Sequence, residues 1–204
     1  MMSIQKINPS TVILFLMMAA VSALRVVFNL SHETFLLANF SPIGAMALFG
    51  GSYFDKRWKA FGFPLFSLFL SDFILHQTVF KTYGYGFLYG SWYWVYGAFA
   101  LITLAGRWIL AKRTVGRFLL SVVVCVFIHW ILTDFGIWLG SKTYAQNLGG
   151  FVDCLVAAIP FEWKFFAGTT IYGLILFGAF GWMQQRYPVL ARNILNSKTV
   201  YISY

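Results

Sequence analysis

The charged residues of this 204-residue chain separate six long apolar blocks. The blocks are Ile7 to Leu24, Thr34 to Phe54, Ala60 to Phe80, Thr82 to Gly106, Phe118 to Ser141 and Phe165 to Gln185. Only Asp72 and Asp134 interrupt them with a charge. Each block is about as long as the roughly 20 residues that a helix needs to cross a bilayer. The pattern therefore predicts a polytopic membrane protein.

The blocks are more typical of helices than of membrane-spanning strands. Stretches such as Thr11 to Ala20 and Phe118 to Phe127 are apolar at both odd and even positions, whereas a strand of a membrane barrel alternates. We expect an all-α fold: one integral membrane domain over residues 1–204, built as a bundle of six transmembrane helices. The expected spans are 8–28, 35–54, 60–77, 88–108, 116–139 and 165–185, with a short cytoplasmic tail at 186–204. The first block lacks a small-residue cleavage site and is interpreted as a retained helix.

Composition agrees with this interpretation. The chain is 60% hydrophobic and 10% charged, against the roughly 25% charge of an average soluble domain. The net charge of +9 comes from basic residues that flank the blocks, and they do not form a patch interleaved with exposed aromatic residues. Nucleic acid is therefore not expected as a partner, and the lipid bilayer is.

The basic residues also predict an orientation. With six spans and a cytoplasmic N-terminus, eleven of the fifteen Lys and Arg residues fall on the cytoplasmic side, which is the side that membrane proteins enrich in these residues. The outer side then receives Arg25, Lys81, Lys142 and Lys164. Both termini are expected in the cytoplasm, and the protein in a bacterial inner membrane.

In this topology the polar residues inside the blocks gather in the outer half of the bundle. Because intramembrane carboxylates are costly, Asp72 and Asp134 are functional candidates, while capping a helix or pairing with Arg25 or Lys81 is an equally weighted alternative. Aromatic residues here also have a second interpretation, as anchors in the headgroup layer. The predicted ligand-binding set is Asn39, Ser41, Asp72, His76, Tyr85, Trp92, Asp134, Asp153 and Glu162.

Several chemistries are not expected. Cys125 falls within a span and Cys154 at the outer surface, so a disulfide is not predicted, and two lone cysteines have no metal-ligand spacing. His76, His129 and Asp134 match no hydrolase or metalloprotease motif, and a Walker motif is absent. We expect no catalytic residues, no metal, no cofactor and no energy-coupling machinery of the chain's own.

Five segments carry a resemblance to a known family: 39–51 (NFSPIGAMALFGG), 70–72 (LSD), 134–139 (DFGIWL), 157–161 (AAIPF) and 176–178 (LFG). From about Arg25 to Gly178 the chain resembles an uncharacterised bacterial membrane protein family related to the substrate-binding S components of energy-coupling factor transporters. Where that family commonly has Asn before Phe-Gly, this chain has Asp134, which argues against an amide-specific role there.

The resemblance implies an S-component-like fold, an outward-facing site for a vitamin or metal ion, and partners in the form of transporter scaffold and ATPase subunits. S components dock onto the scaffold through a small-xxx-small face of their first helix. Ala19 and Ala23 have that spacing on the first predicted span, where small side chains let another helix approach closely.

We therefore expect binding and uptake of a small, vitamin-like micronutrient, with cobalamin among the substrates that suit an aromatic, wide-mouthed site. Two other functions stay open. One is a membrane-embedded hydrolase or transferase that uses Asp72, His76 and Asp134, and the other is a structural membrane protein whose outer polar residues only stabilise loops.

Overall fold

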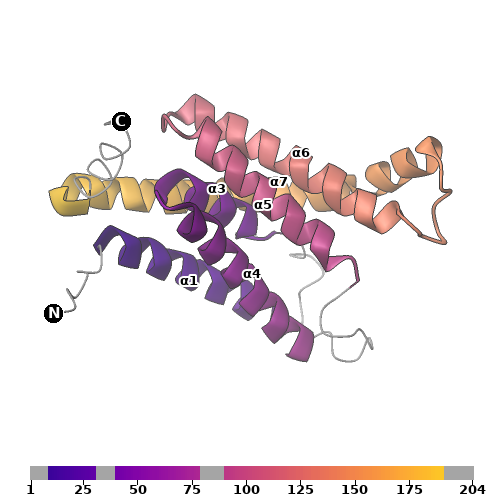
Figure 1. Cartoon of the computed structure of the whole chain (residues 1–204), viewed down its shortest axis with the longest axis horizontal. Coiled ribbons are helices and arrows are strands. Elements are labelled where there is room, and N and C mark those ends of the chain that lie inside the picture. The colour runs from indigo at the N-terminus through magenta and orange to yellow at the C-terminus, as the bar shows by residue number, and fades with distance from the viewer. Residues whose placement is uncertain (1–8, 31–39, 79–89, 191–204) are drawn as a thin grey trace.

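The computed structural model describes residues 9–30, 40–78 and 90–190, and these residues form helices and short connections without a strand. The helices are α1 (Pro9–Leu30), α3 (Ile43–Tyr53), α4 (Arg57–Thr78), α5 (Trp92–Ile109), α6 (Val115–Trp138) and α7 (Leu148–Arg186). Successive helices run in opposite directions along the long axis of the molecule (Figure 1). The predicted all-α fold is thus confirmed for the described part of the chain.

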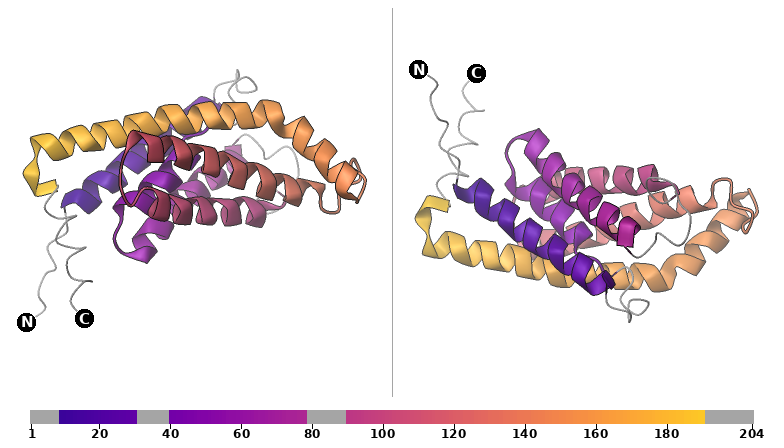
Figure 2. Two further views of the ribbon diagram at one scale, coloured as in Figure 1. Left: turned by 90° about the horizontal axis from the view of Figure 1, so that it is seen from above. Right: turned by 90° about the horizontal axis from the view of Figure 1, so that it is seen from below.

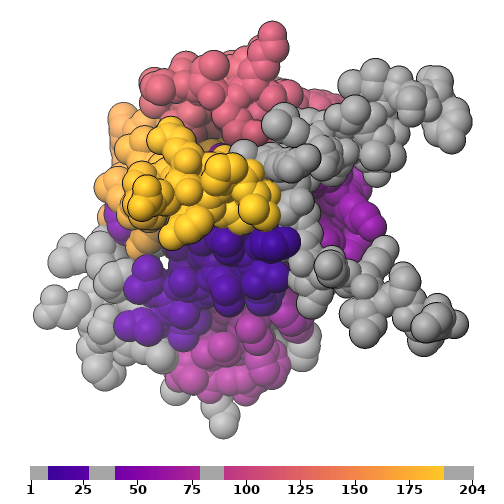
Figure 3. Space-filling model, turned by 90° about the vertical axis from the view of Figure 1, so that its left-hand side faces the viewer, coloured from indigo at the N-terminus to yellow at the C-terminus, as the bar shows by residue number. Residues whose placement is uncertain are grey.

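The two ends of this bundle differ in what they contain. At one end, which we call the terminal end, α1 begins and α7 finishes, and the Ser10 hydroxyl donates a hydrogen bond of 3.2 Å to the Leu190 carbonyl oxygen. Figure 3 looks onto this end and shows the end of α7 lying between α1 and α6. At the opposite end, which we call the far end, α4 and α6 finish and α5 and α7 begin (Figure 1).

Four of the helices are long and apolar enough to cross a membrane, namely α1, α4, α6 and α7. They also present many large apolar side chains outward, including Leu16, Phe66, Leu119 and Leu174, each of which is about half exposed or more. A helix of a water-soluble protein would place polar residues on such a face. The described chain is therefore that of a membrane protein with these four helices of spanning length.

Helix α3 is the exception in length and in burial. It has 11 residues, so it rises only about 16 Å, roughly half the hydrocarbon thickness. Every residue of α3 except Ser52 is buried, and the helix lies inside the bundle. The predicted span began at residue 35. Residues 35–39 lie outside the described part, and the helix itself begins at Ile43, directly after Pro42, whose ring supplies no backbone N–H.

Glycines bring α3 and its neighbours into close contact. A Cβ atom on Gly51 would lie 2.0 Å from the Thr103 carbonyl oxygen of α5, and one on Gly106 of α5 would lie 2.7 Å from the Leu48 carbonyl oxygen of α3. The non-helical segment before α3 packs equally closely on α7, because a Cβ on Gly168 would lie 2.9 Å from the Ser41 nitrogen. Non-helical backbone at membrane depth must be covered by protein in this way.

Helix α7 is much longer than predicted. It begins at Leu148, whereas the last span was expected from residue 165, and its 39 residues rise about 58 Å. Asn147 caps it, with its side-chain oxygen accepting a hydrogen bond of 2.9 Å from the Gly150 nitrogen. Pro160 lies inside the helix, and Figure 2 shows a bend in the first half of α7, as expected where a proline removes a backbone donor.

At the terminal end, two arginines donate hydrogen bonds to backbone carbonyl oxygens at the end of α3. Arg107 of α5 donates hydrogen bonds of 3.1 and 3.0 Å to the carbonyl oxygens of Phe54 and Asp55, just after α3. Arg113 donates to the Ser52 carbonyl oxygen at 2.8 Å and stacks over the Tyr53 ring. Cations at a helix C-terminus satisfy its free carbonyl oxygens and oppose its dipole.

Candidate functional site

Two groups of buried and partly buried polar side chains lie in the far-end half of the bundle. The first, which we call the α1–α4–α5 network, consists of Arg25, Ser71, Asp72 and Tyr96. The second, which we call the α6–α7 cluster, consists of His129, Asp134 and Glu162. Asp72 and Asp134 each precede the far end of their helix by less than two turns, so both lie toward the far end of the bundle.

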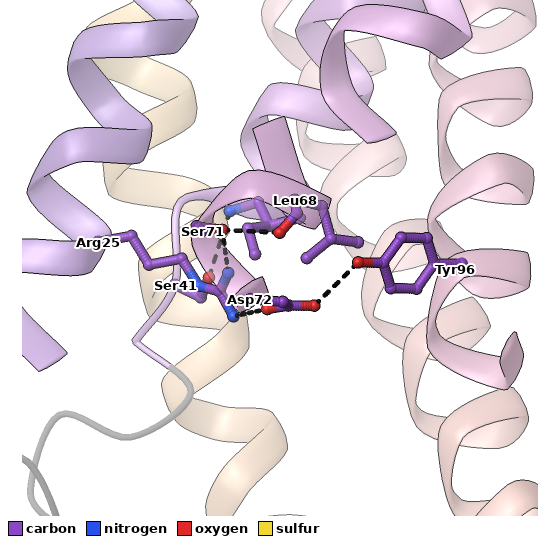
Figure 4. Close-up of polar contacts among 7 residues, drawn as sticks. Arg25, Ser41, Leu68, Ser71, Asp72 and Tyr96 are labelled. Atoms are coloured by element: carbon purple, nitrogen blue, oxygen red, sulfur yellow. Dashed lines mark hydrogen bonds and ion pairs between the residues drawn. The ribbon is translucent and has the colours of Figure 1, made fainter. Parts of the chain in front are cut away.

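The α1–α4–α5 network joins three helices through one carboxylate (Figure 4). Asp72 pairs with Arg25 at 2.8 Å and accepts a hydrogen bond of 3.2 Å from the Tyr96 hydroxyl. Arg25 also donates to the Ser71 hydroxyl, which in turn donates to the Leu68 carbonyl oxygen at 2.9 Å. Pairing with Arg25, one of the two interpretations of Asp72 from the sequence, is therefore confirmed.

His76 follows Asp72 by one turn on α4 and is also buried. Among the described residues, no group lies within hydrogen-bonding distance of its Nδ1 atom. The imidazole therefore has one ring nitrogen available to a further partner.

The α6–α7 cluster is built by two antiparallel helices that face each other. His129 Nδ1 lies 2.8 Å from Glu162 Oε1. Farther toward the far end, the Cys154 thiol of α7 donates to the Asp134 carbonyl oxygen of α6 at 3.7 Å. Asp134 follows His129 by about one and a half turns on α6, and its side chain is also buried.

The carboxylates of this cluster are incompletely satisfied. Asp134 and Glu162 are 4% and 6% exposed. Asp134 Oδ2 and Glu162 Oε2 are both buried and have no hydrogen-bond donor within reach in the part of the chain that the structure describes. A buried acceptor without a donor costs about 1–3 kcal/mol, and more when it is charged. These two oxygens are therefore where an additional donor or cation would be most favourable.

Aromatic rings and the start of α3 form the side of the cluster that faces the terminal end. Phe165 stacks on His129 with ring centroids 4.1 Å apart, and Phe99 of α5 lies 5.7 Å from the same imidazole. Phe165 also reaches α3, because a Cβ on Gly44 would lie 2.7 Å from its ring. The amino end of α3, which carries a partial positive charge, thus lies beside the α6–α7 cluster.

The other predicted binding residues are not all gathered at these two groups. Trp92 is about half exposed at the start of α5 and packs on Tyr96, while Ser41 accepts a hydrogen bond of 3.4 Å from the Ile43 nitrogen. Asp153 is exposed on α7. Asn39 and Tyr85 lie outside the described residues. The proposed docking residues lie on α1, with Ala19 partly buried and Ala23 exposed.

The predicted binding set did not contain His129, Phe165 or Arg25. A signal for the first two was present, because Cys154, Ala158, Glu162, Phe165 and Thr169 recur at the spacing of one helix face, and all five are buried. That period identifies residues 148–164 as helix and turns Glu162 toward α6. The pairing of Arg25 with Asp72 had no comparable signal, since it joins α1 and α4 across the bundle.

The cysteines form no site of their own. Cys125 and Cys154 are both free and both buried. The prediction that Cys154 lies at the outer surface is wrong, because residue 154 belongs to the buried face of α7 and not to a connection. Within the described ranges, no three His, Cys, Asp or Glu side chains converge in a way that would hold a metal ion.

Comparison with known proteins gives a family and no individual relative. No curated protein and no solved structure matches the chain significantly. One family model, described as a family of unknown function (DUF6580), matches residues 5–190. Because this match covers most of the chain, the protein belongs to the DUF6580 family.

Proposed function

We propose that this DUF6580 protein binds a small molecule in the far-end half of its bundle and serves as the substrate-binding membrane component of an uptake system. The observation that carries the proposal is the α6–α7 cluster, in which Asp134 Oδ2 and Glu162 Oε2 are buried without a donor among the described residues. Intramembrane carboxylates of this kind mark substrate or ion sites in many membrane proteins.

The short helix α3 supports the same proposal. Its amino end and the non-helical residues before it lie inside the bundle, next to Phe165 and Gly168 of α7. In secondary transporters, discontinuous helices of this kind place helix ends and free backbone groups at the substrate. Burial of α3 on nearly all sides keeps these backbone groups away from lipid.

The proposal includes an orientation and partners. Six spans with cytoplasmic termini would place the far end outside a bacterial inner membrane, because the basic residues would then concentrate on the cytoplasmic side. The ligand would be a vitamin-like micronutrient that enters from outside. The S-component resemblance adds docking through Ala19 and Ala23 onto a scaffold subunit that works with ATPase subunits.

Mass spectrometry of small molecules that copurify with the protein tests this function. Extracts of the wild type are compared with extracts of Asp134→Asn, which removes the charge and keeps the shape, and of Asp55→Asn, an equivalent change at the terminal end. We expect one compound in the wild type and in Asp55→Asn that is depleted in Asp134→Asn. Equal amounts in all three proteins, or no enriched compound in any of them, would count against the proposal.

A further inference from the structure

The terminal end of the bundle carries a strongly basic surface. Residues 55–59 and 107–117, which include the α3–α4 and α5–α6 connections, contain seven basic side chains and one acidic side chain, that of Asp55. The hydrogen bonds that Arg107 and Arg113 donate to backbone oxygens of residues 52–55 hold the two connections together. We call residues 55–59 and 107–117 the basic surface, because their charges belong to adjacent connections.

Most of this positive charge is not balanced within the described part of the chain. Lys56, Arg57 and Lys112 are exposed, and their side chains make no hydrogen bond or ion pair with another described residue. Arg117 donates a hydrogen bond of 3.1 Å to a backbone carbonyl oxygen, which carries no net charge. Asp55 can balance one positive charge at most. The basic surface therefore attracts a negatively charged partner.

The helix dipoles add to the positive charge of this surface. Arg57 is the first residue of α4 and Arg117 lies in the first turn of α6, and neither first turn contains an acidic residue. Since the amino end of a helix carries a partial positive charge, a cation placed there is unfavourable. An anion bound to the basic surface would offset this repulsion as well as the charges of the side chains.

The surroundings of the basic surface favour a lipid over a soluble anion. Trp58 and Trp108 each follow an arginine of this surface and are 63% and 69% exposed, and exposed tryptophan is typical of the headgroup layer. Val115 and Leu119, 78% and 52% exposed, begin the outward apolar face of α6 beside the same charges. A phospholipid would contact both the cations and this apolar face, whereas a soluble anion would contact the cations alone.

We propose that the basic surface binds an anionic phospholipid, with the phosphate group at Lys56, Arg57 and Lys112 and the acyl chains along the outward face of α6. Clusters of Lys and Arg next to a membrane helix recognise anionic headgroups in this way. The bound lipid would restrain the α3–α4 and α5–α6 connections relative to each other. This inference goes beyond the proposed function, because the basic surface and the α6–α7 cluster lie in opposite halves of the bundle.

Three probes test the proposal on the full-length protein in nonionic detergent. They are phosphatidylglycerol, phosphatidylcholine with the same acyl chains, and inorganic phosphate, and the readouts are the Kd of each lipid from native mass spectrometry and the melting temperature. We expect phosphatidylglycerol to bind about tenfold more tightly than phosphatidylcholine or better, because each cation near an anionic headgroup contributes about fivefold. Phosphatidylglycerol should also raise the melting temperature, and inorganic phosphate should not. Equal affinities for the two lipids, or equal stabilisation by inorganic phosphate and phosphatidylglycerol, would overturn the proposal.

Variants of exposed lysines locate the binding. Lys112→Gln should weaken the binding of phosphatidylglycerol about fivefold, and the double variant Lys56→Gln with Lys112→Gln about 25-fold. Lys142→Gln removes the same charge from an exposed connection at the far end and should leave the Kd unchanged. None of the three side chains is buried, so all variants should melt like the wild type in the absence of lipid. An unchanged Kd in the double variant, or an equal loss in Lys142→Gln and Lys112→Gln, would overturn the assignment to the basic surface.

Discussion

Asp72 and Asp134 are both buried aspartates near one end of the bundle, yet their surroundings give them different roles. The carboxylate of Asp72 is occupied by Arg25 and Tyr96, so its energetic effect is mainly on the packing of α1, α4 and α5. Asp134 keeps a buried oxygen without a donor in the described structure. A paired carboxylate such as that of Asp72 holds helices together. A carboxylate with an oxygen that lacks a donor, such as that of Asp134, is available to a ligand.

Replacement of Asp72 by Asn should therefore destabilise the protein. Hydrogen bonds to charged groups contribute about 1.5–3 kcal/mol, so we expect Asp72→Asn to lower the free energy of unfolding by that amount. Tyr96→Phe, which removes one donor to the same charged carboxylate, should also cost about 1.5–3 kcal/mol. Thermal and denaturant unfolding in detergent measure both. A fully stable Asp72→Asn protein that loses its copurifying compound would instead make Asp72 a ligand-binding residue.

At the scale of the elements, glycines decide how closely α3 approaches its neighbours. Gly106 meets the backbone of Leu48, and Gly51 meets that of Thr103, so the two helices touch at both positions without side chains between them. This close contact lets an 11-residue helix be buried on nearly all sides. It also fixes where the amino end of α3 lies relative to Phe165.

A matched pair of substitutions on α5 tests this contact. A methyl group at residue 106 would lie 2.7 Å from the Leu48 oxygen, so Gly106→Ala should separate the helices and cost about 1–3 kcal/mol, the usual effect of overpacking. Gly97 of the same helix has nothing within 4 Å of an added Cβ, and Gly97→Ala should gain up to about 1 kcal/mol from helix propensity. Equal melting temperatures for the two variants would show that the contact is not tight.

The hydrophobic pattern predicted where helices occur more accurately than the residues at which they begin and end. Long apolar blocks identified the membrane character of α1, α4 and α6, because a spanning helix carries few charged residues over about 20 positions. The pattern did not predict the first part of α7. Its glycines Gly149 and Gly150 and its acids Asp153 and Glu162 are typical of an exposed connection, yet they lie within this helix. Buried charge paired across helices cannot be distinguished from exposed loop charge by position in the sequence alone.

The candidate site was predicted in part for the same reason. Asp134 and Glu162 were both in the predicted set, but placing Glu162 on a buried face beside α6 depends on α7 continuing as a helix through Pro160, which local rules disfavour. His129 was noted only as a polar residue in a span, and its pairing with Glu162 is a contact between helices. Such contacts follow from packing and not from spacing.

For the whole molecule, the first prediction concerns orientation. Lys142 and Lys112 are exposed in connections at the far end and the terminal end respectively, and both native cysteines are buried, so they should react slowly. A membrane-impermeant maleimide added to intact cells should label Lys142→Cys and leave Lys112→Cys unlabelled until the cells are opened. Labelling of Lys112→Cys in intact cells would reverse the orientation and put the site on the cytoplasmic side.

The second prediction for the whole molecule concerns assembly. Ala23 is exposed and Ala19 partly so, and a partner helix that approaches this face of α1 would be kept away by larger side chains. The double variant Ala19→Leu with Ala23→Leu should lose complex formation and uptake, while the copurifying compound is retained in detergent. Normal uptake by the double variant would remove this face from the mechanism.

The burial of α3 bears on how the protein is made. A hydrophobic helix of 11 residues is too short to be held across a bilayer by its own partition into lipid. Its surfaces rest on α5 and α7, which are synthesised later. The nascent chain must therefore keep α3 at the membrane, unassembled, until residues beyond Gly168 have left the ribosome. Biogenesis of this protein thus includes a late packing step, in which α5 and α7 close around a helix that was synthesised before them.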